Sequence, residues 1–346
     1  MKKLISANQA SAFKDLLQRA KKIALVIHVN PDGDAVGSSI AMAHCLRALK
    51  PELEVVLVSP NRYPDFLKWM NGTENILIFK DNRKIAKQAI ATSDMVICLD
   101  FNALSRLEDL GEFIQSVSVP RMLIDHHIEP KLEEFVLSIS NINVSSTSEI
   151  VFRLMKAAMK KPIPLAAAEA IMAGIMTDTN MFRNSCSTPD TFSVISQLLQ
   201  IGVDKDKVAA LIFDNFSGHR MKLLGYALSE KLVILPDCHA AYIALSHEEL
   251  DSFSFQPGDT EGFVNYPLHI KDINISAYIS EQAEGTVRFS FRSRGDFSVN
   301  EFARRHFSGG GHKNAAGGRM DSTLELAIAE YVNQLKNHKD EILASI

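Results

Sequence analysis

Four apolar runs in the first part of the chain constrain its fold more than any other feature. They are IALVIH (23–28), EVVLVS (54–59), MVICLD (95–100) and RMLIDHH (121–127). Each run is continuously apolar and does not alternate with polar residues, which is typical of strands buried on both faces of a parallel sheet. Segments with helical periodicity, including Val36–Leu49, separate the runs. This alternation predicts a doubly wound α/β domain with a mostly parallel sheet.

Helical signals continue after the fourth run. Ser146 and Glu149 have the spacing of a capping box, which predicts a helix that runs to about Lys160. Two further helices are expected, one that follows Pro164 and ends at Asp178 and one that begins near Pro189 and ends at Gly202. We predict that residues 1–203 form the first domain and that residues 204–232 form a helical connector.

The character of the sequence changes after Pro236. The runs AAYIALS, INISAYIS and TVRFSFRS alternate or are rich in β-branched residues, and turns containing Gly, Asn or Asp separate them. An amphipathic helix is expected from Leu324 to about His338. We therefore predict a smaller α+β domain over residues 233–346, with the active site in the cleft between the two domains.

Composition limits the class of protein. A hydrophobic fraction of 46% with 23% charged residues is ordinary for a globular chain, and no apolar run reaches the ~18 residues of a membrane span. The four cysteines lie far apart without a C-x-x-C pair, so reduced thiols in a cytoplasm explain them better than disulfides or structural zinc. We expect a cytoplasmic protein without a membrane partner, and the sequence leaves open whether it forms a homodimer.

Polar residues gather where the predicted strands end. In an open α/β sheet, the carboxyl ends of the strands open onto one crevice, where ligands bind. Alone, each of these residues has an ordinary explanation as a turn or helix-cap residue. Together, converging carboxylates and imidazoles would repel one another and lose solvation without a cation. The residues at or just beyond these ends are His28, Asp32, Asp34, Asp100, Asp125, His126 and His127.

A bound cation would relieve this conflict. Asp178 strengthens the argument, because an Asp at the C-terminal end of a helix meets the unfavourable end of the helix dipole. Oxygen and imidazole ligands without a thiolate suit Mn²⁺, Mg²⁺ or Co²⁺ better than a structural zinc. Five or more such ligands suit two ions ~3.5–4 Å apart. Such a pair polarises a phosphoryl group, generates a bridging hydroxide at neutral pH and stabilises the leaving oxygen.

The same segments resemble a known family. H-V-N-P-D-G-D-A-V-G-S (28–38), Leu99-Asp100, Asp125-His126-His127 and M-T-D-T (176–179) are similar, in order, to the four motifs of the DHH phosphoesterase superfamily. F-S-G-G-G-H-K-N-A-A-G-G (307–318) resembles the glycine-histidine motif of the DHH-associated domain. The resemblance covers nearly the whole chain. It is greatest to the branch of nano-RNases (oligoribonucleases), which degrade very short RNA and remove a phosphate from 3′-phosphoadenosine 5′-phosphate.

The resemblance implies a role for each matching residue. Asp100 would bridge two Mn²⁺ ions per chain, with Mg²⁺ or Co²⁺ as alternatives. His127 would hydrogen-bond the scissile phosphoryl oxygen, and Asp125 would orient an imidazole from the second shell. The catalytic residues would therefore be His127, Asp125 and Asp100. The first ion would be held by His28, Asp32 and Asp100, and the second by Asp34, Asp100, His126 and Asp178.

A basic segment lies in the second predicted domain. Between Gly285 and Met320 there are seven Lys or Arg residues and two acidic residues, in a chain of net charge −4. Arg292 and Arg294 end a predicted strand, close to the glycine-rich loop if the domain is compact. We expect the loop to present consecutive backbone N–H groups as an anion nest, with His312 as a further donor. The predicted substrate-binding residues, for short single-stranded RNA and phosphorylated nucleotides, are Arg292, Arg294, Gly309, Gly310, Gly311 and His312.

Several interpretations stay open. The leading hypothesis is a Mn²⁺-dependent hydrolase in which a metal-bridged hydroxide attacks phosphorus. A cyclic or linear di-adenylate phosphodiesterase is the enzyme alternative, and an inactive nucleotide- or RNA-binding module is the alternative from another class. The intact ligand set argues against the inactive module. Base stacking by the phenylalanines of the basic segment is also open, although strand periodicity places some of them in the core: Phe289, Phe291, Phe297, Phe302 and Phe307.

Overall fold

The computed structural model describes residues 4–184, 186–282 and 285–345 and divides the chain into two compact units, Met1–Asn215 and Phe216–Ile346. The division falls inside the predicted connector, so that α8 (Lys205–Phe213) belongs to the first unit and α9 (Gly218–Glu230) to the second. Each unit has its own sheet and its own core. The predicted cleft between the domains stays a prediction.

A six-stranded sheet forms the centre of the first unit, with strand order β3-β2-β1-β4-β5-β6. All five neighbouring pairs are parallel, which confirms the predicted fold class. The strand order reverses between β1 and β4, and such a reversal is where α/β sheets bind ligands. The strands are β1 (Lys22–Ile27), β2 (Glu54–Ser59), β3 (Ile76–Ile78), β4 (Met95–Leu99), β5 (Arg121–Asp125) and β6 (Leu137–Ser140).

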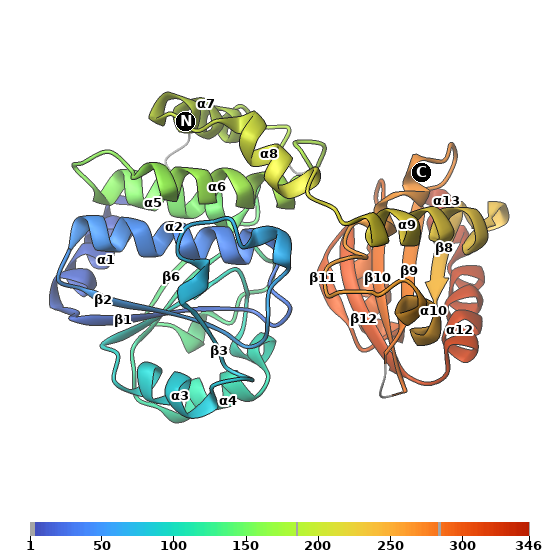
Figure 1. Cartoon of the computed structure of the whole chain (residues 1–346), viewed down its shortest axis with the longest axis horizontal. Helices are drawn as coiled ribbons and strands as arrows, with labels where there is room; N and C mark the ends of the chain where they lie inside the picture. Colours follow the sequence, from blue (N-terminus) through green and yellow to red (C-terminus); the bar gives the residue numbers. More distant parts are fainter. Residues whose placement is uncertain (1–3, 185, 283–284, 346) are drawn as a thin grey trace. The chain divides into compact units, whose positions relative to one another are not determined.

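Helices cover both faces of this sheet (Figure 1). Ile23 and Leu25 of β1 pack against the helices of one face, while Ala24 and Val26 pack against those of the other. This explains why the strand is continuously apolar in sequence. One face carries α1 (Ala7–Arg19), α2 (Gly33–Leu49), α5 (Thr147–Ala158) and α6 (Leu165–Asp178), with α7 (Pro189–Ile201) beyond them, and the other carries α3 (Arg83–Ala91) and α4 (Asp109–Ser116).

Helix α2 begins earlier than the sequence predicted and packs very closely on α6. It begins at Gly33 because the Asp32 side chain caps it, accepting the N–H groups of Asp34 and Ala35. A Cβ atom at Gly37 would lie 2.5 Å from the carbonyl oxygen of Ala170 in α6. Only glycine permits this approach, which brings the start of α2 beside the end of α6.

The other predicted helices of the first unit are confirmed. α6 begins directly after Pro164 and ends at Asp178, and α7 is closed by Gly202 in the left-handed conformation with φ 110°. The capping box predicted for α5 is only half present. The Ser146 hydroxyl accepts the Glu149 N–H, but the Glu149 side chain bonds Ser145 instead of the Ser146 backbone.

The second unit contains a mixed six-stranded sheet of order β11-β12-β10-β9-β8-β7. Its pairs are antiparallel except β8–β9. The three runs predicted as strands lie in β8, β9 and β10. The strands are β7 (Leu232–Leu235), β8 (Ala240–Leu245), β9 (Ile275–Glu281), β10 (Thr286–Ser293), β11 (Gly310–His312) and β12 (Ala315–Asp321).

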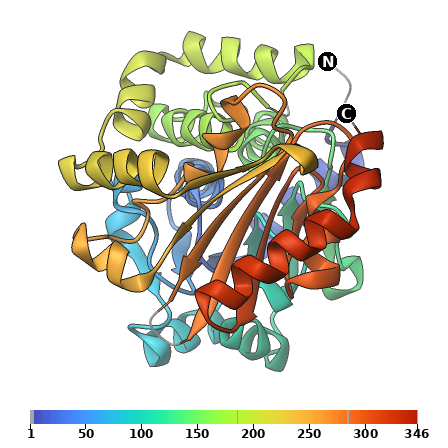
Figure 2. The same cartoon turned by 90° about the vertical axis from the view of Figure 1, so that its right-hand side faces the viewer.

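Helices also lie on both faces of the second sheet. α9 packs on one face, and α11 (Val299–His306) and α12 (Leu324–Asn337) pack on the other, where Figure 2 shows α12 in front of the strands. The predicted final helix is therefore confirmed to within one residue. Two short helices complete the unit, α10 (His247–Ser252) and α13 (Lys339–Ala344). In the part of the chain that the structure describes, no helix has the length and apolar character needed to cross a membrane.

An aromatic cluster fills the core between the second sheet and helices α11 and α12. Phe291 is fully buried, and its ring lies 5.2 Å from that of Phe307 and 5.9 Å from that of Tyr331, centroid to centroid. All five phenylalanines of the basic segment are at most 3% exposed. Base stacking by these residues is therefore excluded, because their rings are already packed against one another.

Candidate metal centre

The polar residues singled out in the sequence converge on the edge of the first sheet where β1, β4 and β5 end. His28 follows β1, Asp100 follows β4, and His126 and His127 follow β5. Asp32 and Asp34 lie at the start of α2, and Asp178 is the last residue of α6. The positions of the strand ends and the close contact of α2 with α6 together bring these seven residues into one cluster.

His28, Asp32 and Asp100 form the first group that could hold a metal ion. The Nε2 atom of His28 lies 3.5 Å from Asp100 Oδ2 and 4.0 Å from Asp32 Oδ1. The Nδ1 atom lies 2.9 Å from the Val29 carbonyl oxygen. Since a carbonyl can only accept, Nδ1 carries the proton, and the lone pair of a neutral ring is on Nε2, facing the carboxylates.

Asp34, His126 and Asp178 form the second group. The Nε2 atom of His126 lies 3.6 Å from Asp178 Oδ2 and 3.9 Å from Asp34 Oδ2. It also lies 3.6 Å from Asp100 Oδ1. Asp100 therefore directs one carboxylate oxygen toward each group, which is the arrangement expected of a bridging ligand.

The backbone of Asp100 is in an uncommon conformation. Its φ of 68° lies in the left-handed region, which is uncommon for a non-glycine residue and costs free energy. The Asp100 N–H donates to the carbonyl of Ile124, which ties the turn to the neighbouring strand β5. The side chain of Asp100 is 2% exposed and is aimed into the cluster.

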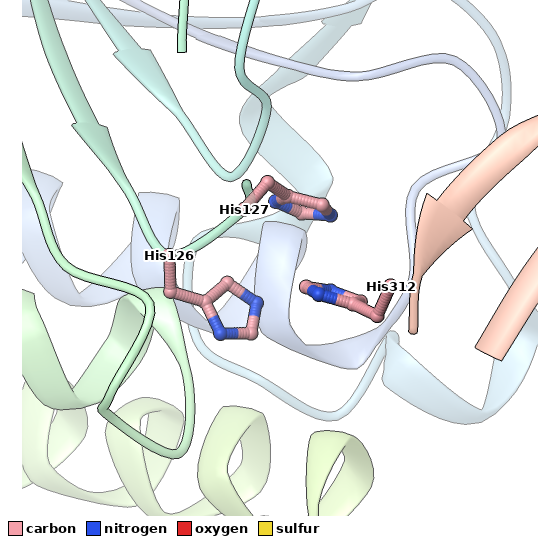
Figure 3. A group of neighbouring side chains, drawn as sticks. All are labelled: His126, His127 and His312. Atoms are coloured by element: carbon pink, nitrogen blue, oxygen red, sulfur yellow. The ribbon is translucent and has the colours of Figure 1, made fainter. Parts of the chain in front are cut away.

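His127 differs from His126 in its partner, although the two rings lie edge to face 4.9 Å apart (Figure 3). The Nδ1 atom of His127 lies 2.7 Å from Oδ1 of the fully buried Asp125. Because an ionised carboxylate only accepts hydrogen bonds, Nδ1 donates here and is not free to bind a metal. The structure thus shows which imidazole Asp125 orients: it is that of His127.

Charges inside the cluster conflict with one another. Burial raises the pKa of Asp34 well above its usual range, and the nearby carboxylates of Asp100 and Asp178 raise it further. Burial together with Asp32 and Asp100 raises the pKa of Asp178 to about 6 against the opposing effect of His126. Divalent cations would relieve this repulsion, and the oxygen and imidazole donors are those that Mn²⁺ and Mg²⁺ accept. The donor set therefore fits the predicted metal ions.

In two histidines and in Asp100 the surroundings favour the charged form of the side chain instead of the neutral form. Burial lowers the pKa of His127, but the hydrogen bond to Asp125 and the surrounding carboxylates raise it overall to about 9. The pKa of His28 is also raised, because the effect of burial is outweighed by Asp100 and Asp32. Burial alone would raise the pKa of Asp100, yet the three histidines hold it well below its usual range.

Thr147 and Ser148 are part of this cluster, and the sequence analysis did not include them. Both lie in the first turn of α5 and donate backbone N–H groups to the Asp34 carboxylate. The available signal was the Ser-Ser-Thr-Ser-Glu sequence at 145–149, since the first turn of a helix favours a carboxylate partner. That segment was interpreted only as a helix cap.

The glycine run of the second unit is a strand and not an anion nest. The Gly309 N–H donates to the Ala303 carbonyl, and the Gly311 N–H donates to Asn300 Oδ1, so two of the three predicted donors are already used. Glycine is required for a different reason. A Cβ atom at Gly309 would lie 2.0 Å from the Gly317 carbonyl oxygen of β12. The prediction that three consecutive N–H groups of this run bind an anion is therefore wrong.

The remaining predicted substrate residues lie on the same sheet. Arg292 is in β10 and pairs with Ala315 of β12, while His312 of β11 pairs with the same residue from the other side. Arg294 follows β10 and is exposed. Arg292 and His312 thus lie on the two strands that flank β12, and Arg294 lies in the turn after β10; their binding role stays a prediction.

Comparisons with known proteins agree with the motifs. The profile of the DHH family, N-terminal domain, matches residues 22–175, and that of the DHHA1 domain matches residues 239–344. The chain is 30% identical over 337 residues to the probable bifunctional oligoribonuclease and PAP phosphatase NrnA of Streptococcus mutans, covering 94% of this chain and 99% of the relative.

Two further proteins are similar over most of this chain. The cyclic-di-AMP phosphodiesterase GdpP of Geobacillus thermodenitrificans is 25% identical, over 94% of this chain and 48% of the relative. The crystal structure of an exopolyphosphatase-related protein from Bacteroides fragilis superposes with a TM-score of 0.93 and 37% identity, over 99% of both chains. The chain therefore belongs to the DHH family of phosphoesterases, with an N-terminal DHH domain and a C-terminal DHHA1 domain, and is a hydrolase.

Proposed function

We propose that this phosphoesterase uses two Mn²⁺ ions to hydrolyse very short RNA oligonucleotides and to remove the 3′-phosphate of 3′-phosphoadenosine 5′-phosphate. One observation carries the proposal: two groups of candidate metal ligands lie where the strand order reverses, and Asp100 directs one carboxylate oxygen toward each group. The name of the Streptococcus mutans relative, which the chain matches over almost its full length, supports the two substrate classes.

Each proposed ion has its own ligands and a share in Asp100. His28, Asp32 and Asp100 would hold the first ion, and Asp34, Asp100, His126 and Asp178 would hold the second. When bound, the ions supply Lewis acidity toward a phosphoryl oxygen and a water molecule activated as nucleophile. The protein fixes the donors beforehand, because Asp34 and Asp100 are buried and hydrogen-bonded and His28 presents Nε2 to the carboxylates.

His127 acts on the substrate and not on the metal. Asp125 accepts the Nδ1 proton at 2.7 Å and fixes the orientation of the ring. The hydrogen bond to Asp125 raises the pKa of His127 and so favours the imidazolium form, in which Nε2 can donate to a phosphoryl oxygen. Asp125 is fully buried and therefore contributes by holding His127, without touching the substrate.

The second unit supplies the phosphate-binding groups in this proposal. Because the glycine run uses two of its three N–H groups internally, the side chains of Arg292, Arg294 and His312 are the main anion donors. Gly309 and Gly311 contribute by allowing this segment to lie close against β12, since a Cβ atom at either would meet the β12 backbone. Recognition of a terminal phosphate at a fixed distance from the scissile bond would favour substrates of only a few nucleotides.

A length series tests the proposal directly. Purified protein with Mn²⁺ is incubated with 3′-phosphoadenosine 5′-phosphate and with RNAs from two nucleotides to a few tens, and the products are separated by chromatography. We expect the highest rates on the shortest RNAs and release of phosphate from the bisphosphorylated nucleotide. Equal rates at all lengths would contradict selection by a terminal phosphate.

A second candidate activity is cleavage of cyclic or linear di-adenylate. The relative from Geobacillus thermodenitrificans, named as a cyclic-di-AMP phosphodiesterase, favours its inclusion. Initial rates on the cyclic and the linear dinucleotide separate the two activities, since a requirement for a terminal phosphate excludes the cyclic form. Calorimetric titration with Mn²⁺ addresses the remaining alternative, because fewer than two ions per chain would favour an inactive binding module.

A further inference from the structure

We propose that Thr147 is a positioning residue that fixes Asp34 and Asp100, so that one residue orients two carboxylates of the second proposed metal site. The inference rests on the proposed function, because it concerns the ligands of the two ions. Thr147 belongs to none of the motifs on which the family resemblance was based. It is fully buried at the first position of α5.

The backbone of Thr147 holds Asp34. Its N–H donates to Asp34 Oδ2 at 2.6 Å, and the N–H of the next residue, Ser148, donates to Asp34 Oδ1 at 2.9 Å. Both carboxylate oxygens are thus held by the first turn of α5, where the helix dipole also favours a negative charge. Asp34 is 1% exposed, so these bonds replace the hydration that it has lost.

The side chain of Thr147 holds Asp100. The hydroxyl group donates to Asp100 Oδ1 at 2.9 Å, since the carboxylate is the acceptor. Oδ1 is the oxygen that faces His126, at 3.6 Å from its Nε2 atom. The bond therefore orients the half of the Asp100 carboxylate that would serve the second ion, in a residue whose backbone is already in a strained conformation.

Neighbouring residues fix the position of Thr147 in turn. The Ser146 hydroxyl caps α5 by accepting the Glu149 N–H, and the buried Glu149 carboxylate accepts bonds from Ser145, Arg153 and Thr191. On the side of α6, Gly174 leaves the space that the segment needs. The start of α5 is thus held by bonds that do not involve the proposed ligands.

A conservative pair of substitutions tests the hydroxyl alone. Thr147→Val keeps the shape and the backbone N–H but removes the donor to Asp100, and Thr147→Ser keeps the donor. Loss of a partner that orients a metal ligand typically lowers metal affinity about 10–100-fold. We expect this loss for Thr147→Val and recovery to within about threefold of the unsubstituted protein for Thr147→Ser. Both are measured by calorimetry and by electron paramagnetic resonance of bound Mn²⁺.

Thr73→Val is the matched control. The Thr73 side chain is also buried, at 2% exposed, but its hydroxyl donates only to the backbone carbonyls of Lys68 and Met70. Unfolding of the metal-free variants shows how much stability each buried hydroxyl contributes. If Thr147→Val does not fold, Thr147→Ala replaces it, since alanine retains the N–H and lacks the hydroxyl.

The outcomes separate this inference from the proposed function. Two Mn²⁺ ions bound by Thr147→Val with unchanged affinity would overturn the positioning role, as would equal losses in Thr147→Val and Thr73→Val. A selective loss that serine rescues would support it. Failure of the unsubstituted protein to bind Mn²⁺ would instead contradict the proposed function, whatever the variants do.

Discussion

The two units bury very different side chains, and the difference indicates what each region does. The carboxyl edge of the first sheet buries Asp34, Asp100 and Asp125, and the carboxyl groups of Asp34 and Asp178 have raised pKa values. The second unit buries an aromatic cluster around Phe291 whose members contact one another. The first arrangement is costly without a cation, whereas the second is a stable core by itself.

This contrast separates residues that serve function from residues that serve stability. Phenylalanines beside a basic segment suggested a surface for nucleotide bases, but they form the interior of the second unit. Recognition of a substrate by this unit must therefore depend on its polar groups. In the first unit, buried charges contribute little to stability, which points to a role in the proposed chemistry.

Removal of Asp100 should have the largest effect. Asp100→Ala deletes the carboxylate shared by both groups, so we expect activity to fall by at least about 10³-fold, because each ion contributes several kcal/mol to transition-state stabilisation. Mn²⁺-dependent hydrolysis and metal content are measured together. Asp94→Ala is the control, since the exposed Asp94 carboxylate only accepts the N–H groups of Lys21 and Lys22. Activity retained with intact metal content would refute the mechanism.

Phe291→Ala tests the stability side of the comparison. Truncation of this fully buried ring should lower the free energy of unfolding of the second unit by about 3–5 kcal/mol, as for other buried aromatic residues. Denaturant unfolding monitored by circular dichroism measures the effect. The control is Phe192→Ala in α7, where the ring is 50% exposed and the expected loss is about 1 kcal/mol or less. If the variant were as stable as the unsubstituted protein but bound RNA poorly, a role of Phe291 in substrate binding would be supported instead.

Substitution of the arginines near the end of β10 tests whether the second unit binds substrate phosphate. Arg292→Ala and Arg294→Ala should each raise the KM for short RNA about 10-fold or more, because a hydrogen bond between charged groups contributes ~1.5–3 kcal/mol. A much smaller change in kcat is expected if these residues bind phosphate away from the scissile bond. Arg305→Ala is the control, since Arg305 is exposed and forms an ion pair with Glu301 at 2.7 Å. Equal effects of all three substitutions would indicate only a general loss of positive charge.

Gly174→Ala tests how tightly the charged region is packed. A Cβ atom at this position would lie 2.0 Å from Ser148 Oγ and 2.8 Å from Asp34 Oδ1, so the start of α5 must shift. We expect a loss of about 1–3 kcal/mol in stability, as for other overpacked positions, together with weaker Mn²⁺ binding. Gly225→Ala in α9 is the control, because nothing lies within 4 Å of its Cβ position. Unchanged Mn²⁺ affinity in Gly174→Ala would mean that the site tolerates movement of α5.

The smallest expected effect is a pH dependence of the metal-free protein. The pKa of His127, about 9, lies above its ordinary value of 6.5, so the folded state binds the proton more tightly than the unfolded state. The resulting stabilisation is fully present below pH 6.5 and is lost as the pH rises through about 9. The difference in unfolding free energy between the unsubstituted protein and His127→Asn should shrink by on the order of 1 kcal/mol over this range. A constant difference would contradict the ion pair with Asp125.

The parallel sheet could be predicted because strands that are buried on both faces are continuously apolar in sequence. β2 was predicted at its observed bounds, and β1, β4 and β5 end one or two residues earlier than predicted. Those early ends are informative, since His28, Asp100 and His126 lie in the turns and not in the strands. The short edge strands β3 and β6, of three and four residues, were not predicted because so few residues carry little pattern.

The candidate metal ligands could be predicted from the sequence, but the residues that hydrogen-bond and orient them could not. Thr147 forms hydrogen bonds with Asp34 and Asp100, which lie 113 and 47 positions away, and the sequence at 145–149 indicates a helix start that favours a carboxylate without indicating which one. The glycine run shows the same limit, because a hairpin strand and an anion nest can have the same sequence. Only the pairing with β12 distinguishes them, and that pairing is a tertiary contact. Asp32 caps α2 and is also a candidate metal ligand, so the turn-like sequence around it fits both explanations.

The close packing of α2 on α6 would have a consequence for ion selectivity in the proposed metal centre. The two helices carry Asp34 and Asp178, so their separation would determine how wide an ion the two carboxylates can share. Gly33 and Gly37 set that separation, since a methyl group at either would push against Thr177 or Ala170 of α6. Larger residues at these two positions would move the helices apart and shift the metal preference of the proposed site toward larger cations such as Ca²⁺, while every donor atom stayed the same.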